Sequence, residues 1–164
     1  MDTYTLEKEI WTHSDFEKMG WHDTKIYGIA IEKNDDNFGA DFLLDIDYIF
    51  KWVRPALSAG CFTFWVAPCT LIFKNCFDLC IGIETRGAAL GFTEMEINDL
   101  NLIGVVEQEK NKFVYHWIID LQGGRIELKS YGFEQIVRHK PIHVQRQSLS
   151  LEERGEINFG RKPC

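Results

Sequence analysis

Hydrophobic and polar side chains alternate along several stretches of this chain, which indicates β-strands because successive strand residues point to opposite faces. Residues 41–52 are the clearest case, since one row of alternate positions is wholly apolar: Phe42, Leu44, Ile46, Tyr48, Phe50 and Trp52. The other row is mixed and carries Asp45 and Asp47. Residues 112–121 alternate in the same way and predict a strand in the middle of a sheet.

Turn residues connect these stretches into a β fold. Gln122-Gly123-Gly124 supplies the glycines of a tight hairpin, and alternation resumes over residues 125–129. Further strands are expected at residues 25–32, 61–67, 70–75, 79–84, 94–98, 102–107 and 132–138. Capping-box spacing predicts short helices after Ser14 and after Ser150. We therefore expect an all-β protein, an antiparallel sandwich or open barrel of about nine strands with one or two short helices.

The length of 164 residues fits one domain spanning residues 1–164, with residues 160–164 expected to fray. The predicted core consists of Phe42, Leu44, Ile46, Trp65, Phe73, Tyr115, Trp117, Ile119, Ile126 and Leu128. Phe62 and Phe64 are also assigned to the core rather than to a binding surface.

The net charge of −7 argues against nucleic acid as a partner, because phosphate binding needs clustered Lys and Arg, and it favours a basic protein partner. The longest mostly apolar stretch, residues 60–72, contains Pro68 and is too short for a membrane helix. The acidic first residues differ from a secretory signal, so we expect a cytoplasmic protein. Five cysteines without an export signal suggest buried thiols rather than disulfides.

Two groupings of polar residues are candidate sites. Trp21, His22 and Asp23 precede an expected strand, and an imidazole beside a carboxylate can act as a base or a metal ligand if a turn makes the two converge. The simpler interpretation places Trp21 in the core and Asp23 at backbone amides. Asp45 and Asp47 share a strand face about 7 Å apart and could bind a divalent cation or act as an acid–base pair. A solvated strand face with Lys51 nearby explains these aspartates more simply and is the favoured interpretation.

The common catalytic and nucleotide-binding motifs do not occur, and no cofactor is predicted. The basic pair Arg138-His139 could meet an acidic ligand, or it could discourage pairing at the edge of a sheet. The leading hypothesis is therefore a cytoplasmic binding protein. The alternative is a metal-assisted hydrolase or divalent-ion-binding protein with His22 as base or nitrogen ligand, beside Asp23, and Asp45 and Asp47 as oxygen ligands.

Several motifs resemble a family of small bacterial all-β proteins. They are Trp21-His22-Asp23, Asp45-Ile46-Asp47-Tyr48-Ile49 and Phe64-Trp65-Val66-Ala67-Pro68-Cys69-Thr70-Leu71, and the resemblance runs from about Met19 to Arg138. It implies a coherent fold, but no activity is established for that family.

A looser likeness is to immunity proteins of bacterial toxin systems. Some of them look similar in a His-Asp turn before a strand and in a Phe-x-x-Val-x-Asp-Leu junction, which is matched here by residues 73–79 with Cys76 in place of the valine. This likeness transfers no binding residue. It implies a small protein that masks a toxin.

Overall fold

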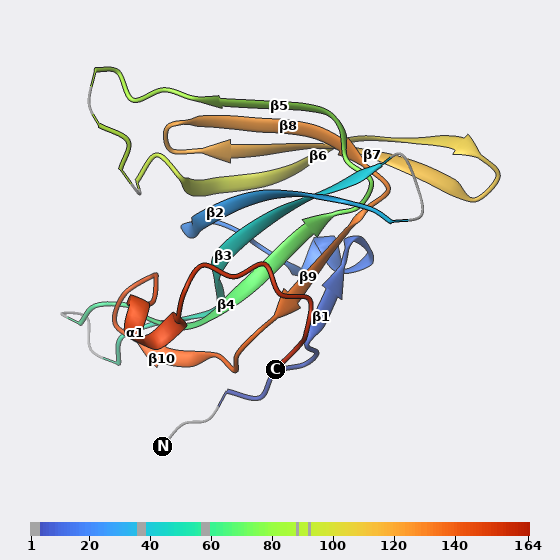
Figure 1. The fold of residues 1–164 in the computed structure, drawn as a ribbon. Coiled ribbons are helices and arrows are strands. Elements are labelled where there is room, and N and C mark those ends of the chain that lie inside the picture. Colours follow the sequence, from blue (N-terminus) through green and yellow to red (C-terminus); the bar gives the residue numbers. More distant parts are fainter. Residues whose placement is uncertain (1–3, 36–38, 57–59, 88, 92) are drawn as a thin grey trace.

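The computed structural model describes residues 4–35, 39–56, 60–87, 89–91 and 93–164, and ten strands in this part of the chain form one antiparallel sheet (Figure 1). The strands are β1 (Ile10–Thr12), β2 (Thr24–Lys33), β3 (Ala40–Val53), β4 (Thr63–Phe73), β5 (Phe77–Ile83), β6 (Glu96–Glu109), β7 (Lys112–Leu121), β8 (Gly124–Ser130), β9 (Phe133–Val137) and β10 (Ile142–Val144). Their order is β1-β9-β4-β3-β2-β6-β7-β8-β5, with β10 paired to β4. The predicted all-β antiparallel class is confirmed, and the sheet is open because β1 and β5 lie at opposite ends of this order.

The sheet bends sharply between β2 and β6, which pair only at Thr24–Ile97 and Lys25–Glu96. Figure 1 shows the result as two layers, one with β6, β7, β8 and β5 and the other with β3, β4, β9 and β1. Apolar side chains of both layers meet in one core that includes Phe42, Leu71, Trp117, Ile126 and Phe133. We call the sheet face toward this core the inner face. Of the ten residues from Phe42 to Leu128 that were predicted to form the core, all but the partly buried Tyr115 are buried.

Two long strands were each predicted as two short ones. Residues 61–67 and 70–75 fall largely in β4, which continues through Pro68. The proline is tolerated because β10 pairs with Phe64–Val66 and β9 pairs with Cys69–Phe73, so Pro68 lies in the gap between these two partners. Residues 94–98 and 102–107 likewise belong mostly to β6, which has bulges instead of a break. The short strands β1 and β10 were not predicted.

Both described helices are a few residues long. The 3₁₀ helix at His13–Lys18 begins two residues earlier than predicted, because its capping box is formed by Thr12 and Asp15 instead of Ser14 and Glu17. The helix α1 (Leu151–Arg154) follows the predicted cap Ser150, whose side chain accepts from the Glu153 amide. No helix in the described ranges is long and apolar enough to cross a membrane.

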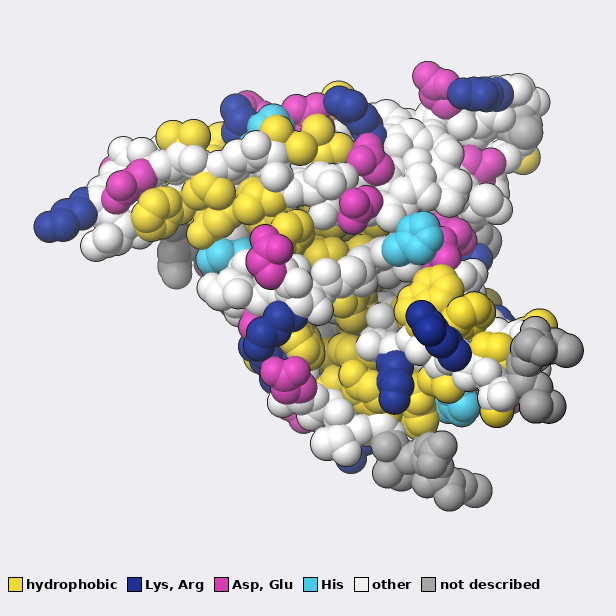
Figure 2. Space-filling view, turned by 180° about the vertical axis from the view of Figure 1, so that it is seen from behind, with side chains coloured by type: hydrophobic (Ala, Val, Ile, Leu, Met, Phe, Trp, Pro, Cys, Tyr) yellow, Lys and Arg dark blue, Asp and Glu magenta, His cyan; other side chains and the backbone are white. Residues whose placement is uncertain are grey.

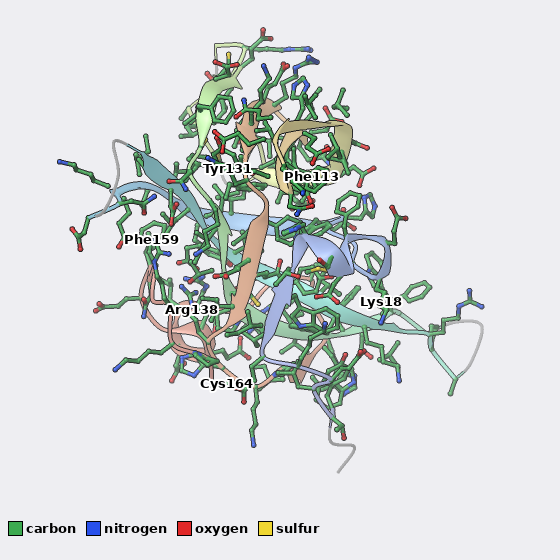
Figure 3. The ribbon with its side chains drawn as sticks, turned by 90° about the vertical axis from the view of Figure 1, so that its right-hand side faces the viewer. Lys18, Phe113, Tyr131, Arg138, Phe159 and Cys164 are labelled. Carbon is green, nitrogen blue, oxygen red and sulfur yellow. The ribbon has the colours of Figure 1, made fainter. Side chains whose placement is uncertain are left out.

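Residues 145–164, which we call the C-terminal strap, cross the outer face of the layer that contains β3, β4 and β9. Asp47 on β3 accepts from the Leu149 amide, Thr70 on β4 donates to the Gly160 carbonyl at 2.8 Å, and the Cys164 amide donates to Val137 on β9. Phe159 covers Leu43, Ile72 and Ile136 on this face. Figure 3 labels Phe159, Arg138 and Cys164 along this side of the molecule. Residues 160–164, which were expected to fray, thus hydrogen-bond to the sheet.

The cysteines are less buried than predicted. Cys69 is buried and Cys76 is half-buried, whereas Cys61, Cys80 and Cys164 are exposed and all five are free thiols. Cys80 is exposed because β5 is the last strand of the sheet and turns this side chain away from the core.

Candidate functional site

His22 and Asp23 converge because a tight turn precedes β2. The Thr24 amide donates to the Trp21 carbonyl at 3.0 Å, and Asp23 has a φ of 61°. The left-handed backbone at Asp23 turns its carboxylate toward the imidazole, so that Oδ1 lies 3.5 Å from His22 Nε2. The other carboxylate oxygen accepts from Gln147 Nε2 at 2.6 Å. Trp21 itself is buried in the core, and its indole donates to the Gln135 side chain.

The His22 imidazole is held on two further sides. Its Nδ1 lies 3.0 Å from the Asn98 carbonyl, and its ring stacks on the Trp52 indole at a centroid distance of 6.3 Å and an angle of 19°. The side chain is nevertheless 66 % exposed, so the ring is fixed in place but open to solvent.

Trp52 belongs to a group of aromatic side chains at the loop end of the β3–β4 hairpin. A bulge between Ile49 and Lys51 places Trp52 opposite Phe64, which packs with Ile49 on the outer face. Trp52 contacts the Phe64 and Phe62 rings edge-on at 4.9 and 6.0 Å. We call His22, Trp52, Phe62 and Phe64 the aromatic corner.

The aromatic corner exposes two large rings: Trp52 is 41 % exposed and Phe62 is 44 % exposed. The assignment of Phe62 to the core was therefore wrong, whereas Phe64 is buried as expected. Figure 2 shows this part of the surface on its right-hand side, where hydrophobic side chains lie below a histidine and close to acidic side chains.

Three carboxylates lie near the contacts of His22, and we call Asp23, Glu96 and Asp99 the acidic strip. Strand pairing places Asp47, Lys25 and Glu96 side by side on the outer face. Burial and the neighbouring Asp23 raise the pKa of Glu96, and these effects outweigh the opposite influence of Lys25 and His22. Asp99 follows Asn98, the residue that contacts the imidazole. Acidic side chains are therefore gathered on this side of the corner, with Lys25 among them.

Asp45 and Asp47 lie on the same outer face but are fully buried, so the interpretation as a solvated strand face is wrong. Asp45 accepts from Arg138 at 2.5 Å, from Arg154 at 2.6 Å and from the Asn158 amide at 3.0 Å. Asp47 accepts from Arg154 Nε at 3.0 Å and from the Leu149 amide at 2.8 Å. Such hydrogen bonds offset the cost of removing charged groups from water.

Arg154 is the centre of this network. Its guanidinium lies 3.8 Å over the Tyr27 ring and pairs with both aspartates, which keeps its pKa above the ordinary value despite burial. Burial raises the pKa of Tyr27 to about 12, and Asp47 contributes to the rise. Burial also raises the pKa of Asp47, against the opposing effect of the Leu149 amide and Arg154.

The two predicted groupings thus share one face and one segment of chain. Gln147 binds Asp23, and Leu149, two residues later, binds Asp47. The two groupings differ in whether solvent can reach their side chains. The carboxylates of Asp45 and Asp47 are occupied by arginines and backbone amides, whereas His22 is open to solvent.

Both arginines were missed as partners of the aspartates. Arg138 was considered a charge at a sheet edge, but it directly follows β9, which lies between β1 and β4, and it is buried against Asp45. A signal was present in the sequence, because two aspartates in a strand with apolar residues on both faces require buried cations. The pairing could not be seen in the sequence because Arg154 lies 109 residues after Asp45.

No group of three or more His, Cys, Asp or Glu side chains suited to hold a metal ion occurs among the described residues. The binding of a divalent cation at Asp45 and Asp47 stays a prediction. No protein-family model, curated protein or solved structure matches this chain.

Proposed function

We propose that this chain is a cytoplasmic binding protein that recognises another protein through the aromatic corner. The observation that carries the proposal is the exposure of Trp52 and Phe62 side by side. Tryptophan is prominent among residues that dominate binding energies, and contiguous exposed apolar surface marks interaction sites.

Packing against neighbouring rings also holds Trp52 in place, which favours binding. The β3–β4 pairing continues to Val53 and Thr63, and Trp52 is braced by Phe64 beneath it and by His22 at its face. A side chain that is already fixed loses little conformational entropy when a partner covers it.

We propose a basic partner. The whole chain carries a net charge of −7, and Asp23 of the acidic strip lies beside His22, which stacks on Trp52. Opposite charges would steer association and increase its rate, most strongly at low salt. A small acidic protein that masks a basic toxin, as the likeness to immunity proteins implies, fits this surface.

The test compares Trp52→Ala and Phe62→Ala with Phe113→Ala, because Phe113 is 40 % exposed on the β6–β7 hairpin, outside the aromatic corner. Partners retained from the native lysate are identified and purified, and their affinities are measured by calorimetry. We expect Trp52→Ala to weaken binding by at least about 2 kcal/mol and Phe113→Ala to leave it unchanged. A partner that binds Trp52→Ala as tightly as the unchanged protein contradicts the proposal.

The 3.5 Å approach of Asp23 to His22 favours hydrolysis as a second candidate. A carboxylate beside an exposed imidazole can orient it as a general base. Turnover of an ester or amide substrate that is abolished by His22→Ala, together with heat on titration with Mg²⁺, Ca²⁺, Mn²⁺ or Zn²⁺, would support metal-assisted hydrolysis. Turnover unaffected by His22→Ala would exclude His22 as the base.

A further inference from the structure

We infer that the aromatic corner and the acidic strip together accept an arginine side chain of the partner, with its guanidinium over the Trp52 indole and its N–H groups donating to Asp23 or Glu96. This inference rests on the proposed function, which it deepens by naming the chemical group that is recognised.

The protein already binds one of its own arginines in this way. Arg154 lies 3.8 Å over the Tyr27 ring and donates to Asp47 at 3.0 Å on the same outer face. The internal site therefore combines an aromatic ring with carboxylates on neighbouring strands, which is the environment that suits a planar cation.

The aromatic corner and the acidic strip repeat these components, with an exposed ring near a mostly buried Asp23 carboxylate. Asp47 belongs to the internal site, and the same row across the sheet continues through Lys25 to Glu96 in the acidic strip. His22 connects the strip to the ring, because its imidazole stacks on Trp52 and its Nε2 lies 3.5 Å from Asp23. The indole is 41 % exposed, which leaves room for a stacked group.

The charges around this site favour a cation despite two nearby basic residues. Lys25 lies between Asp47 and Glu96, and Arg54 is exposed just beyond the end of β3. Burial and, after it, the nearby Asp23 raise the pKa of Glu96 even with Lys25 present, as expected for two carboxylates close together. A guanidinium placed between them would relieve this repulsion.

Arginine fits better than lysine for two reasons. Its guanidinium is flat and stacks on an indole, and its fork of donors can bind a carboxylate through two parallel hydrogen bonds. An ammonium group is compact and strongly hydrated, so it loses more on leaving water.

The experiment titrates the protein with acetyl-Gly-Arg-Gly-amide and with its citrulline counterpart, which has nearly the same shape without the charge. The readout is the indole N–H resonance of Trp52, assigned by its loss in Trp52→Phe. We expect saturable shifts with the arginine peptide and binding weaker by about tenfold or more with citrulline, since charged hydrogen bonds contribute about 1.5–3 kcal/mol.

The variants are Asp23→Asn and Glu96→Gln, with Glu84→Gln as a control on an exposed acid near the end of β5. Asparagine tolerates the positive φ of residue 23, so the turn is kept. We expect the double variant Asp23→Asn/Glu96→Gln to weaken arginine binding about tenfold and Glu84→Gln to have no effect. Equal binding of both peptides, or shifts that leave Trp52 unaffected, overturns the inference.

The experiments distinguish a failure of the arginine site from a failure of the proposed binding function. A protein partner that is lost with Trp52→Ala but retained with Asp23→Asn/Glu96→Gln would support the binding function and overturn the arginine site. An arginine peptide that binds at Trp52, with a protein partner indifferent to Trp52→Ala, would support the arginine site and remove the aromatic corner as the protein interface.

Discussion

The Nε of Arg154 donates to Oδ1 of Asp47 across 3.0 Å, and both side chains are fully buried. This pair fastens the C-terminal strap to the middle of β3. A second carboxylate, Asp45, accepts from the same guanidinium, so that removing Arg154 would leave two buried acids without a shared cation.

We expect Arg154→Met to lower the free energy of unfolding by about 3–5 kcal/mol, because an unpaired buried charge costs far more than the pair contributes. Urea unfolding followed by tryptophan fluorescence measures the change. The control is Arg125→Met, since Arg125 is half-exposed and its loss should cost less than about 1 kcal/mol. Equal stabilities of the two variants would show that the buried network contributes little.

Gly124 begins β8 with a φ of 154°, and a Cβ at this position would lie 2.0 Å from the Gly82 carbonyl oxygen on β5. The obstacle is backbone, which cannot move aside without separating the two strands. We therefore expect Gly124→Ala to cost about 3 kcal/mol in the free energy of unfolding. Gly104→Ala is the matched control, because no atom lies within 4 Å of its added Cβ, and it should change the free energy of unfolding by less than about 0.5 kcal/mol. A small effect at Gly124 would contradict the close approach of β5.

Stability should fall in acid because of Asp41. Burial acts to raise the pKa of this carboxyl, but hydrogen bonds from the Asn75 amide, Asn34 and Arg161 lower it below the ordinary value. A carboxyl whose pKa is lower in the folded state stabilises the protein above its unfolded pKa of about 3.9, and this contribution is lost as the pH falls through the folded value. Urea unfolding between pH 6 and 3 should show a decline below about pH 4 that is shallower in Asp41→Asn. An identical slope in the variant would refute the assignment.

The five thiols should separate into two classes. Cys61, Cys80 and Cys164 are exposed and should react with dithionitrobenzoate in the native protein. Burial raises the pKa of Cys76 to about 11 and that of Cys69 well above its usual range, so both should react only after unfolding in urea. Reaction of Cys69 in native buffer at the rate of Cys80 would mean that β4 opens far more readily than its burial indicates.

The sequence predicted most of the inner core, because alternation is a local property of each strand. Phe42, Leu44 and Ile46 on β3 face the core exactly as their spacing requires, and the Gly123-Gly124 hairpin lies where predicted. Alternation failed near the end of β3, where the bulge before Lys51 moves Trp52 to the other face. A bulge leaves no reliable mark in one sequence, so the exposure of Trp52 could not be predicted.

The candidate site was predicted only in part, because the sequence shows local neighbours but not distant ones. His22 and Asp23 are neighbours, and only the turn that makes them converge had to be supplied by the structure. The partners of Asp45 and Asp47 come from residues about a hundred positions later, and pattern alone cannot pair residues so far apart. The acids of strand β6 that join the aromatic corner depend on the β2–β6 pairing, which spans only two residue pairs.

The distance along the chain between Asp47 and Arg154 also sets an order of events during synthesis. A ribosome makes Asp45 and Asp47 more than a hundred residues before the arginine that neutralises them. Until residue 154 has left the ribosome, Asp47 has no arginine to pair with and the outer face of β3 cannot be closed, although Arg138 can already bind Asp45. The layer of β5, β6, β7 and β8 can assemble earlier, since the β7–β8 hairpin and the strands before it are already made. The strap is therefore the last part to join, and the nascent protein keeps a hydrated, unfinished surface until then.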